Sequence, residues 1–404
     1  MSTLKLTAAS GGGTVALKGP ATTTGNAALE LTVPGAESGE LVTKDSDDSL
    51  VNVQGINGGQ IGHRNLIING SQVIDQRNSG TEVNPVVHAK CVTDRFKFDL
   101  SQASKVKAQQ VADGPTGFTK SLKITSLAAT TPGASDYYLL QQNIEGLNSA
   151  HLGWGASGAK TVILSFWVKS SLTGTFATAI RNNGFDRTNV QTYAISVANT
   201  WEKKTITFTG DTSGTWLTTN GVGLRVGWDL GGGTDFDAAS TGSWLATNDF
   251  TTSSCTHLVA TNAATWQITG VQLELGDYAT SYEFKTYQEE LAACMRYYET
   301  HNHLTTAKTT DGSVTSQWST ITSNDSNTLV VSTGIVYKVP KRVWPTVTLY
   351  NPGDTSTAAR VNAQGTERTV TATYGGANAL TRIYVSGASS GNYVTYNWEA
   401  DAEL

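Results

Sequence analysis

Residues 265–299 constrain the fold more than any other stretch, because they join a strand to the only helical pattern in the sequence. Apolar side chains occupy even positions at Trp266 and Ile268 and odd positions from Val271 onward. Side chains alternate between the two faces of a strand, so this change of phase predicts a β-bulge at residues 269–270. A strand that is apolar on one face and ends at a glycine is typical of the closing strand of a β-sandwich.

The segment after this strand carries the signals of one amphipathic helix. Thr286 and Glu289 have the spacing of a capping box, in which each side chain bonds the backbone N–H of the other residue. Apolar residues then recur at helical spacing and form a single stripe. The stripe consists of Tyr287, Leu291, Cys294 or Met295, and Tyr298. The pattern predicts a helix over residues 287–299 that packs through this stripe.

Strand patterns fill most of the remaining chain, and the fold class is predicted to be all-β. Charged residues make up only 15%, there are 41 glycines, and helical periodicity is otherwise missing. Strands at regular spacing, such as 137–144 and 222–230, favour a two-sheet sandwich, and specifically a jelly roll, over a βαβ fold. The predicted organisation is an N-terminal segment over residues 1–62, a jelly-roll module with its closing helix over 63–297, and a C-terminal β-sandwich over 298–404.

The N-terminal segment contains short alternating pieces, at residues 4–6, 15–17 and 29–31, separated by turn signals. A single chain cannot bury enough apolar surface with such strands to offset the entropy of ordering them. Either the segment is a leader without fixed structure, or it pairs with identical segments from other copies. The regular β-turn-β rhythm and the low charge favour pairing.

Charge, hydropathy and motifs argue against several functional classes. The net charge of −5 and the lack of a Lys/Arg cluster argue against nucleic-acid binding. No apolar run is long enough to cross a bilayer, and the N-terminus has no signal-peptide core. The widely spaced cysteines, Cys91, Cys255 and Cys294, are predicted to be free thiols of a protein that folds in a reducing cytosol. Catalytic signatures are missing as well, so we expect no enzyme activity.

Several sequence blocks, in order, resemble tail-fiber and related virion proteins of tailed bacteriophages. The blocks are NLIINGSQVIDQRNSG, TDRFKF, LSFWVKSSLTGTF, TWEKKTITFTGD, and ITGVQLELGDYAT followed by YQEELAACMRYYE. They extend over residues 64–299 and are similar to jelly-roll modules of the carbohydrate-binding type. VYKVPKRVWPTVTLYNPGD and the terminal YNWEADAEL resemble the C-terminal sandwich of many phage tail proteins. Residues 1–60 resemble the adaptor and stalk segments of trimeric fibers.

The resemblance implies a virion structural protein, most directly a homotrimeric tail fiber that adheres to host surface glycans. Such a fiber would be assembled in the host cytoplasm and would attach to other virion proteins through its N-terminal segment. Two alternatives stay open. One is a fiber or decoration protein on the capsid surface, and the other is the accessory carbohydrate-binding module of a polysaccharide-degrading enzyme.

Tryptophans and one acidic loop are the candidate ligand-binding residues. Trp154, Trp216 and Trp244 lie in turn-rich stretches and are expected to reach solvent, where a sugar ring can stack on an indole; the alternative is that they cover the edge of the sandwich. The loop of residues 229–244 is the best single candidate surface, because binding residues tend to lie on long loops of rigid scaffolds.

The same loop contains three carboxylates that suggest a site for a hard cation such as calcium, namely Asp229, Asp235 and Asp237. EF-hand spacing is missing. Related carbohydrate-binding modules hold calcium with an acidic pair in the last strand, but here the corresponding residues are Thr269 and Gly270, so that site is not predicted.

His301 and His303 directly follow the predicted helix and would share one side of an extended segment. Three chains around a threefold axis would bring six imidazoles together, similar to the His-x-His metal sites on the axes of some trimeric phage fibers. Imidazole suits Fe, Ni, Cu or Zn. The alternative is a polar linker with both rings in solvent. No other cofactor is predicted.

Overall fold

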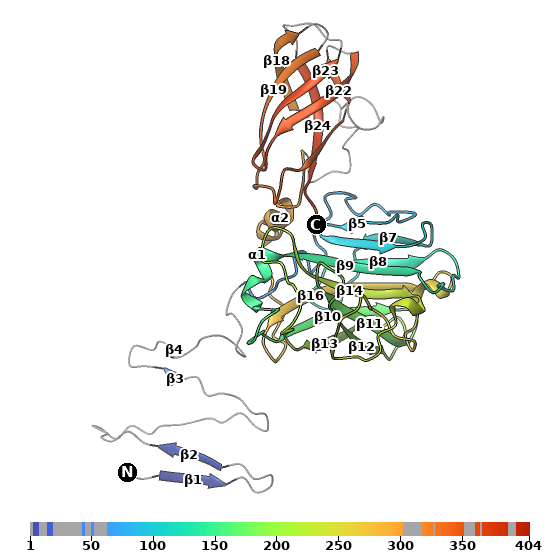
Figure 1. Cartoon of the computed structure of the whole chain (residues 1–404), viewed down its shortest axis with the longest axis vertical. Helices are drawn as coiled ribbons and strands as arrows, with labels where there is room; N and C mark the ends of the chain where they lie inside the picture. Colours follow the sequence, from blue (N-terminus) through green and yellow to red (C-terminus); the bar gives the residue numbers. More distant parts are fainter. Residues whose placement is uncertain are drawn as a thin grey trace, which may run out of the picture. The chain divides into compact units, whose positions relative to one another are not determined.

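The structure is a computed structural model that describes residues 3–7, 14–18, 43–44, 50–51, 63–301, 317–325, 328–350, 360–363, 366–386 and 393–404. The chain divides into two compact units, Met1–Val53 and Gln54–Leu404. In the first unit, β1 (Thr3–Thr7) pairs with β2 (Thr14–Lys18), and β3 (Thr43–Lys44) pairs with β4 (Leu50–Val51), both antiparallel (Figure 1). The strands expected at residues 4–6 and 15–17 are confirmed, whereas residues 29–31 lie outside the described part. Pairing between copies stays a prediction.

The second unit begins with a jelly roll of two antiparallel sheets, as the sequence predicted (Figure 1). The seven-stranded sheet has the order β15 (Trp244–Leu245), β12 (Thr188–Ile195), β11 (Gly174–Arg181), β14 (Val222–Gly232), β9 (Tyr137–Glu145), β6 (Phe96–Leu100), β5 (Lys90–Thr93). The five-stranded sheet has the order β13 (Glu202–Phe208), β10 (Val162–Ser170), β16 (Thr265–Leu275), β8 (Ser121–Ser126), β7 (Val106–Val111). Short helical turns connect some strands, namely α1 (Gly146–Ser149), η1 (Ala150–Leu152), η2 (Thr234–Phe236) and η3 (Leu258–Ala260).

The core lies between these two sheets and follows the period-two alternation of the strands. In β6, Phe96 and Phe98 are fully buried, while the alternate residues Lys97 and Asp99 point to the opposite face. Trp228 on β14 is fully buried and meets Phe166 of β10 edge to face at 5.8 Å. Trp266 is also fully buried, so the predicted core role of both tryptophans is confirmed. One face of each sheet is therefore assigned to the core, and the other face is available for a site.

The bulge and the start of the helix predicted for residues 265–299 are confirmed, whereas Tyr287, which was predicted to pack in the apolar stripe, is 45% exposed. The register of β10 against β16 shifts between Ser165 and Trp167, where β16 contributes one extra residue, and Gly270 has a φ of 61°. This is the β-bulge that the change of apolar phase predicted. The helix α2 (Tyr287–Met295) begins with the predicted capping box.

The expected C-terminal end of the helix was wrong, because α2 stops at Met295. Two features end it. The ammonium of Lys341 donates to the carbonyl oxygen of Met295 at 2.6 Å, which satisfies one of the last carbonyls of the helix. Tyr298 then enters a new strand, β17 (Tyr298–Thr300), that pairs with the end of the chain. Tyr298 is therefore buried as a strand residue and does not belong to the helical stripe.

The C-terminal part of the second unit forms an eight-stranded sheet (Figure 1). Pairings run from β24 through β18, β19, β23, β22 and β21 and return to β24, so the strand order closes on itself. The bounds are β18 (Gln317–Asp325), β19 (Thr328–Val336), β20 (Thr346–Tyr350), β21 (Arg360–Ala363), β22 (Thr366–Gly375), β23 (Ala379–Ser386) and β24 (Tyr393–Asp401). The strands β17 and β20 pair with the last residues of β24. The all-β fold class is confirmed, and within the described residues no helix is long and apolar enough to cross a membrane.

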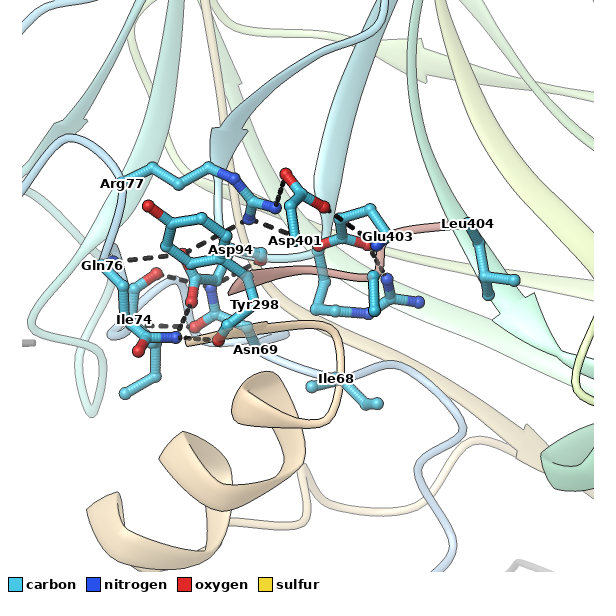
Figure 2. A network of polar contacts seen from close by, with 12 residues as sticks. Ile68, Asn69, Ile74, Gln76, Arg77, Asp94, Tyr298, Asp401, Glu403 and Leu404 are labelled. Carbon is cyan, nitrogen blue, oxygen red and sulfur yellow. Dashed lines mark hydrogen bonds and ion pairs between the residues drawn. The ribbon is translucent and has the colours of Figure 1, made fainter. Parts of the chain in front are cut away.

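The last residues of the chain are fixed to the jelly roll by a buried polar network (Figure 2). Arg77 donates to Asp401 at 3.0 Å and to Glu403 at 3.3 Å, and Arg95 also donates to Glu403. The guanidinium of Arg77 stacks on the ring of Tyr298 at 3.8 Å. Burial alone would raise the pKa of Glu403, but the charges of Arg95 and Arg77 outweigh burial and lower it. We interpret this network as structural and not as a binding site, because its arginines are paired with carboxylates of the same network.

Candidate functional site

The outer face of the seven-stranded sheet carries a cleft of ≈ 360 Å³. This volume lies within the range of small-ligand sites. Residues of β6, β9, β11, the turn after β11, and η2 line the cleft, among them Lys97, Asp99, Tyr137, Arg181, Phe185 and Phe236. We call this site the sheet cleft.

The strand alternation explains why these residues face the cleft. In β6, Lys97 and Asp99 lie between core residues and so point outward. Asp99 lies opposite Leu139 of β9 in the antiparallel register, which places both side chains on the same face. Tyr137 shares this face because it is two residues before Leu139. The floor of the cleft is therefore made by ordinary strand geometry.

One wall of the sheet cleft comes from the long segment between β14 and β16. The ring of Phe236 in η2 packs on Phe250 with centroids 4.8 Å apart, and it meets Tyr137 edge to face at 6.0 Å. Phe250 is 2% exposed and packs with Leu139 and small residues of β11 on the outer face of the sheet. The segment is thus fixed to the sheet by apolar contacts, so its aromatic wall is preformed.

Polar groups of the cleft are held by hydrogen bonds on the sheet surface. Gln141 donates to a carboxylate oxygen of Asp99 at 2.6 Å, and Lys97 lies 3.8 Å from the other oxygen. Arg181 donates to the side-chain oxygens of Asn248 at 2.8 Å and Gln141 at 3.0 Å. The arrangement combines aromatic faces with fixed donors and acceptors, which is the chemistry that recognises the faces and hydroxyls of a sugar.

Two arginines lie side by side on the outer face of the sheet, and one of them, Arg181, lines the cleft. Arg181 of β11 is directly opposite Arg225 of β14 in the antiparallel register. The exposed ring of Phe185 covers both, with its centroid 5.3 Å from the guanidinium carbon of Arg181 and 4.3 Å from that of Arg225. Arg225 donates to Asn183 at 3.2 Å. Its Nε and Nη1 atoms are buried without a hydrogen-bond partner among the described residues.

The three tryptophans singled out in the sequence come together, although not in this cleft. Trp154 meets Trp216 at 4.7 Å and Trp244 at 5.3 Å, all edge to face. We call this group the tryptophan cluster. Trp154 is only 9% exposed, contrary to its expected contact with solvent, because its indole N–H donates to Lys160 and its ring is enclosed by the other two. A cavity of ≈ 130 Å³ adjoins the cluster. Ligand binding by these residues stays a prediction.

The three predicted carboxylates of the loop lie in different environments. Asp229 is 1% exposed, accepts a hydrogen bond from Thr251, and has a pKa raised to about 6 by burial. Asp235 is exposed and accepts from Ser135, whereas Asp237 is partly buried. No group of three or more His, Cys, Asp or Glu residues in the described part is arranged to hold a metal ion.

Only one of the two predicted metal-binding histidines lies in the described part. His301 is half-buried, its backbone N–H donates to Trp398 at 2.9 Å, and burial lowers the pKa of its ring. His303 lies outside the described residues. A metal shared between three chains therefore stays a prediction.

Sequence reasoning identified the segment that forms the aromatic wall but not the residues that line the sheet cleft. The segment of residues 229–244 was chosen because it is a long loop on a rigid scaffold, and its aspartates suggested a cation site, whereas its contribution to the cleft is Phe236. Arg181 and Arg225 were missed. An available signal was that Arg225 stands within an apolar strand and Arg181 ends one, so that each strand carries a single arginine.

Comparisons with known proteins establish no family for the chain. No family model matches, and no curated protein matches. Among solved structures, the chain is similar to the enzymatically active domain of tailspike protein 4 of bacteriophage CBA120, with a TM-score of 0.30, 11% identity, and coverage of 52% of this chain and 21% of that one. It is also similar to the family 11 carbohydrate-binding module of Clostridium thermocellum, with a TM-score of 0.26, 12% identity, and coverage of 50% and 98%. The N-terminal cellulose-binding domain of Cellulomonas fimi β-1,4-glucanase C is similar with a TM-score of 0.25, 15% identity, and coverage of 44% of this chain and 91% of that one.

Proposed function

We propose that the chain is an adhesive structural protein of a phage virion, most directly a tail fiber, that binds host surface glycans in the sheet cleft. The observation that carries glycan binding is the cleft itself. Tyr137 and Phe236 form a preformed aromatic corner, and Asp99, Arg181 and Asn248 present fixed hydrogen-bonding groups in the same cleft. A site of this kind needs no conformational change to receive a sugar ring, which lowers the entropic cost of binding.

The virion role is supported by the ordered sequence blocks over residues 64–299 that resemble phage tail proteins. Adhesion by many copies fits a small site of modest affinity, because linked weak sites reach high overall avidity on a repetitive surface. Labelling of purified particles with antibody-coated gold would place the protein on the tail or on the capsid. Labelling of neither would contradict the virion role.

Glycan binding is tested by probing the purified full chain on an array of bacterial surface glycans, followed by calorimetry with the glycans that bind. We expect Tyr137→Ala and Phe236→Ala each to weaken binding about tenfold, because an aromatic contact contributes roughly 1 kcal/mol or more. Tyr278→Ala is the matched control, since Tyr278 is 67% exposed and does not line the cleft. Wild-type binding by folded cleft variants, or the failure of every glycan to bind, would contradict the proposal.

A further inference from the structure

The arginine pair beside Phe185 is expected to destabilise the folded protein when no ligand is bound. Like charges directly opposite one another in an antiparallel pair are destabilising, and Arg181 and Arg225 are such a pair. Neither forms an ion pair with a carboxylate in the described part of the chain. Burial is the main cause that lowers the pKa of Arg181 to about 10, with the neighbouring charge of Arg225 adding to it. Both guanidiniums stay charged at neutral pH, because an arginine side chain is not deprotonated near neutrality, although Arg181 is buried and Arg225 is half-buried.

A nearby carboxylate, Asp99, does not neutralise the charge of both arginines. Asp99 is the acidic group whose field opposes the lowered pKa of both arginines. It already lies 3.8 Å from Lys97 and accepts a hydrogen bond from Gln141. Three cations therefore share one anion, which leaves a local charge of +2 on a chain whose formal net charge is −5. Asp229 faces the same side of the sheet but is buried under the loop and bonded to Thr251.

A ligand can supply the missing negative charge. Arg181 lines the cleft, whereas Arg225 does not: Phe185 covers its guanidinium and two of its nitrogens are buried, so its charge acts on a ligand through the electric field and not by direct contact. A guanidinium binds planar carboxylates and tetrahedral oxyanions through paired hydrogen bonds. The aromatic corner of Tyr137 and Phe236 lies in the same cleft, so a sugar ring and an anionic substituent can be held together.

We infer that the sheet cleft selects acidic glycans, binding a sugar unit that carries a carboxylate or a sulfate ester with its negative charge beside Arg181 and within the field of Arg225. This specificity rests on the proposed glycan binding. It adds a charge requirement that the aromatic corner alone does not impose. Binding should be sensitive to ionic strength, because part of its free energy is coulombic.

The test compares three matched probes by calorimetry with the full chain: a galacturonate trisaccharide, its carboxyl-reduced form, which is the neutral galactose trisaccharide, and a sulfated galactose trisaccharide. We expect an acidic probe to bind at least about tenfold more tightly than the neutral one, and the difference to shrink as sodium chloride is raised. The carboxylated and sulfated probes together identify which anion is preferred.

Charge-removing variants locate the effect. Arg225→Gln should weaken binding of the acidic probe about tenfold and leave the neutral probe within about twofold, while Arg225→Lys should retain much of the preference. Lys203→Gln is the control, because it removes one positive charge from an exposed position that does not line the cleft. Arg181→Gln breaks hydrogen bonds to Gln141 and Asn248, so its melting temperature is measured alongside binding.

The outcomes separate this inference from the proposed function. Equal affinity for acidic and neutral probes, or no effect of Arg225→Gln, overturns the inference. If array glycans bind in a Tyr137-dependent way but are neutral, the inference falls and glycan binding stands. If no glycan or probe binds, glycan binding itself is contradicted. Binding of a short single-stranded DNA as tight as that of the acidic probe would show a general anion site and also overturn the inference.

Discussion

Trp154 contributes more to the stability of the jelly roll than a loop position would indicate. Its ring is enclosed by Trp216 and Trp244 and its N–H is bonded to a backbone carbonyl. We expect Trp154→Ala to lower the free energy of unfolding by about 3–5 kcal/mol, because a large buried ring leaves a cavity. Urea denaturation would measure this. Trp344→Ala is the control, since Trp344 is 57% exposed, and equal effects of both variants would contradict the enclosure of Trp154.

The tryptophans also show how far the sequence alone can predict whether a side chain is buried. Phase along a strand placed Trp228 and Trp266 correctly in the core, because alternation between faces is a local property. For Trp154, exposure depended on the folding of two distant loops over it, and no local pattern contains that information. Arg181 and Arg225 were missed for a related reason, because their juxtaposition depends on a pairing between two strands that are distant in the sequence.

Helix α2 packs on the jelly roll through Leu291, and this packing can be tested by substitution. Leu291 is 9% exposed and packs with Ile74, Cys294 and Met295. We expect Leu291→Asp to lower the free energy of unfolding by about 3 kcal/mol, because it places an unpaired charge in an apolar contact. Ala292→Asp adds the same charge to an exposed position of the same helix and should cost less than about 1 kcal/mol. A melting temperature of Leu291→Asp equal to that of the control would show that the stripe is not buried.

The start of this helix and the bulge before it were predictable because local chemistry determines both. A capping box needs only Thr286 and Glu289 at the right spacing, and a bulge needs only a change of apolar phase. The end of the helix was not predictable in this way. It depends on Lys341, which reaches the last carbonyls from a distant segment, and on pairing of β17 with β24.

For the whole molecule, the sequence predicted the all-β class and the jelly roll but not the site. The sheet cleft is built from residues as distant as Lys97, Arg181 and Phe236. They meet because β6, β9, β14 and β11 are neighbours in the seven-stranded sheet, where β14 lies between β9 and β11 although it follows both in the chain. The spacing of residues along the chain does not predict which strands become neighbours in the sheet. The family resemblance supplied the expectation of glycan binding, and the geometry supplied the surface on which to test it.

At the same scale, the network that joins the C-terminus to the jelly roll predicts a pH dependence (Figure 2). The side chain of Arg95 is 2% exposed, so Glu403→Gln leaves a buried charge without its carboxylate and should lower the free energy of unfolding by about 3 kcal/mol at pH 7. The pKa of Glu403 is lowered from 4.5 in the folded protein. Its contribution is therefore fully present above pH 4.5 and is lost as the pH falls through the lower, folded-state value.

The difference in unfolding free energy between wild type and Glu403→Gln should consequently be largest near neutral pH and shrink at about pH 3. Asp94, in the same network, acts in the opposite direction, because burial raises its pKa to about 6 and favours the folded state as the pH falls. Since Asp94 is present in both proteins, its contribution largely cancels in the difference. Asp277→Asn, at an exposed position, should change stability little at any pH. A difference for Glu403→Gln that stays constant from pH 7 to about pH 3 would mean that the carboxylate of Glu403 does not hold the C-terminus through its charge.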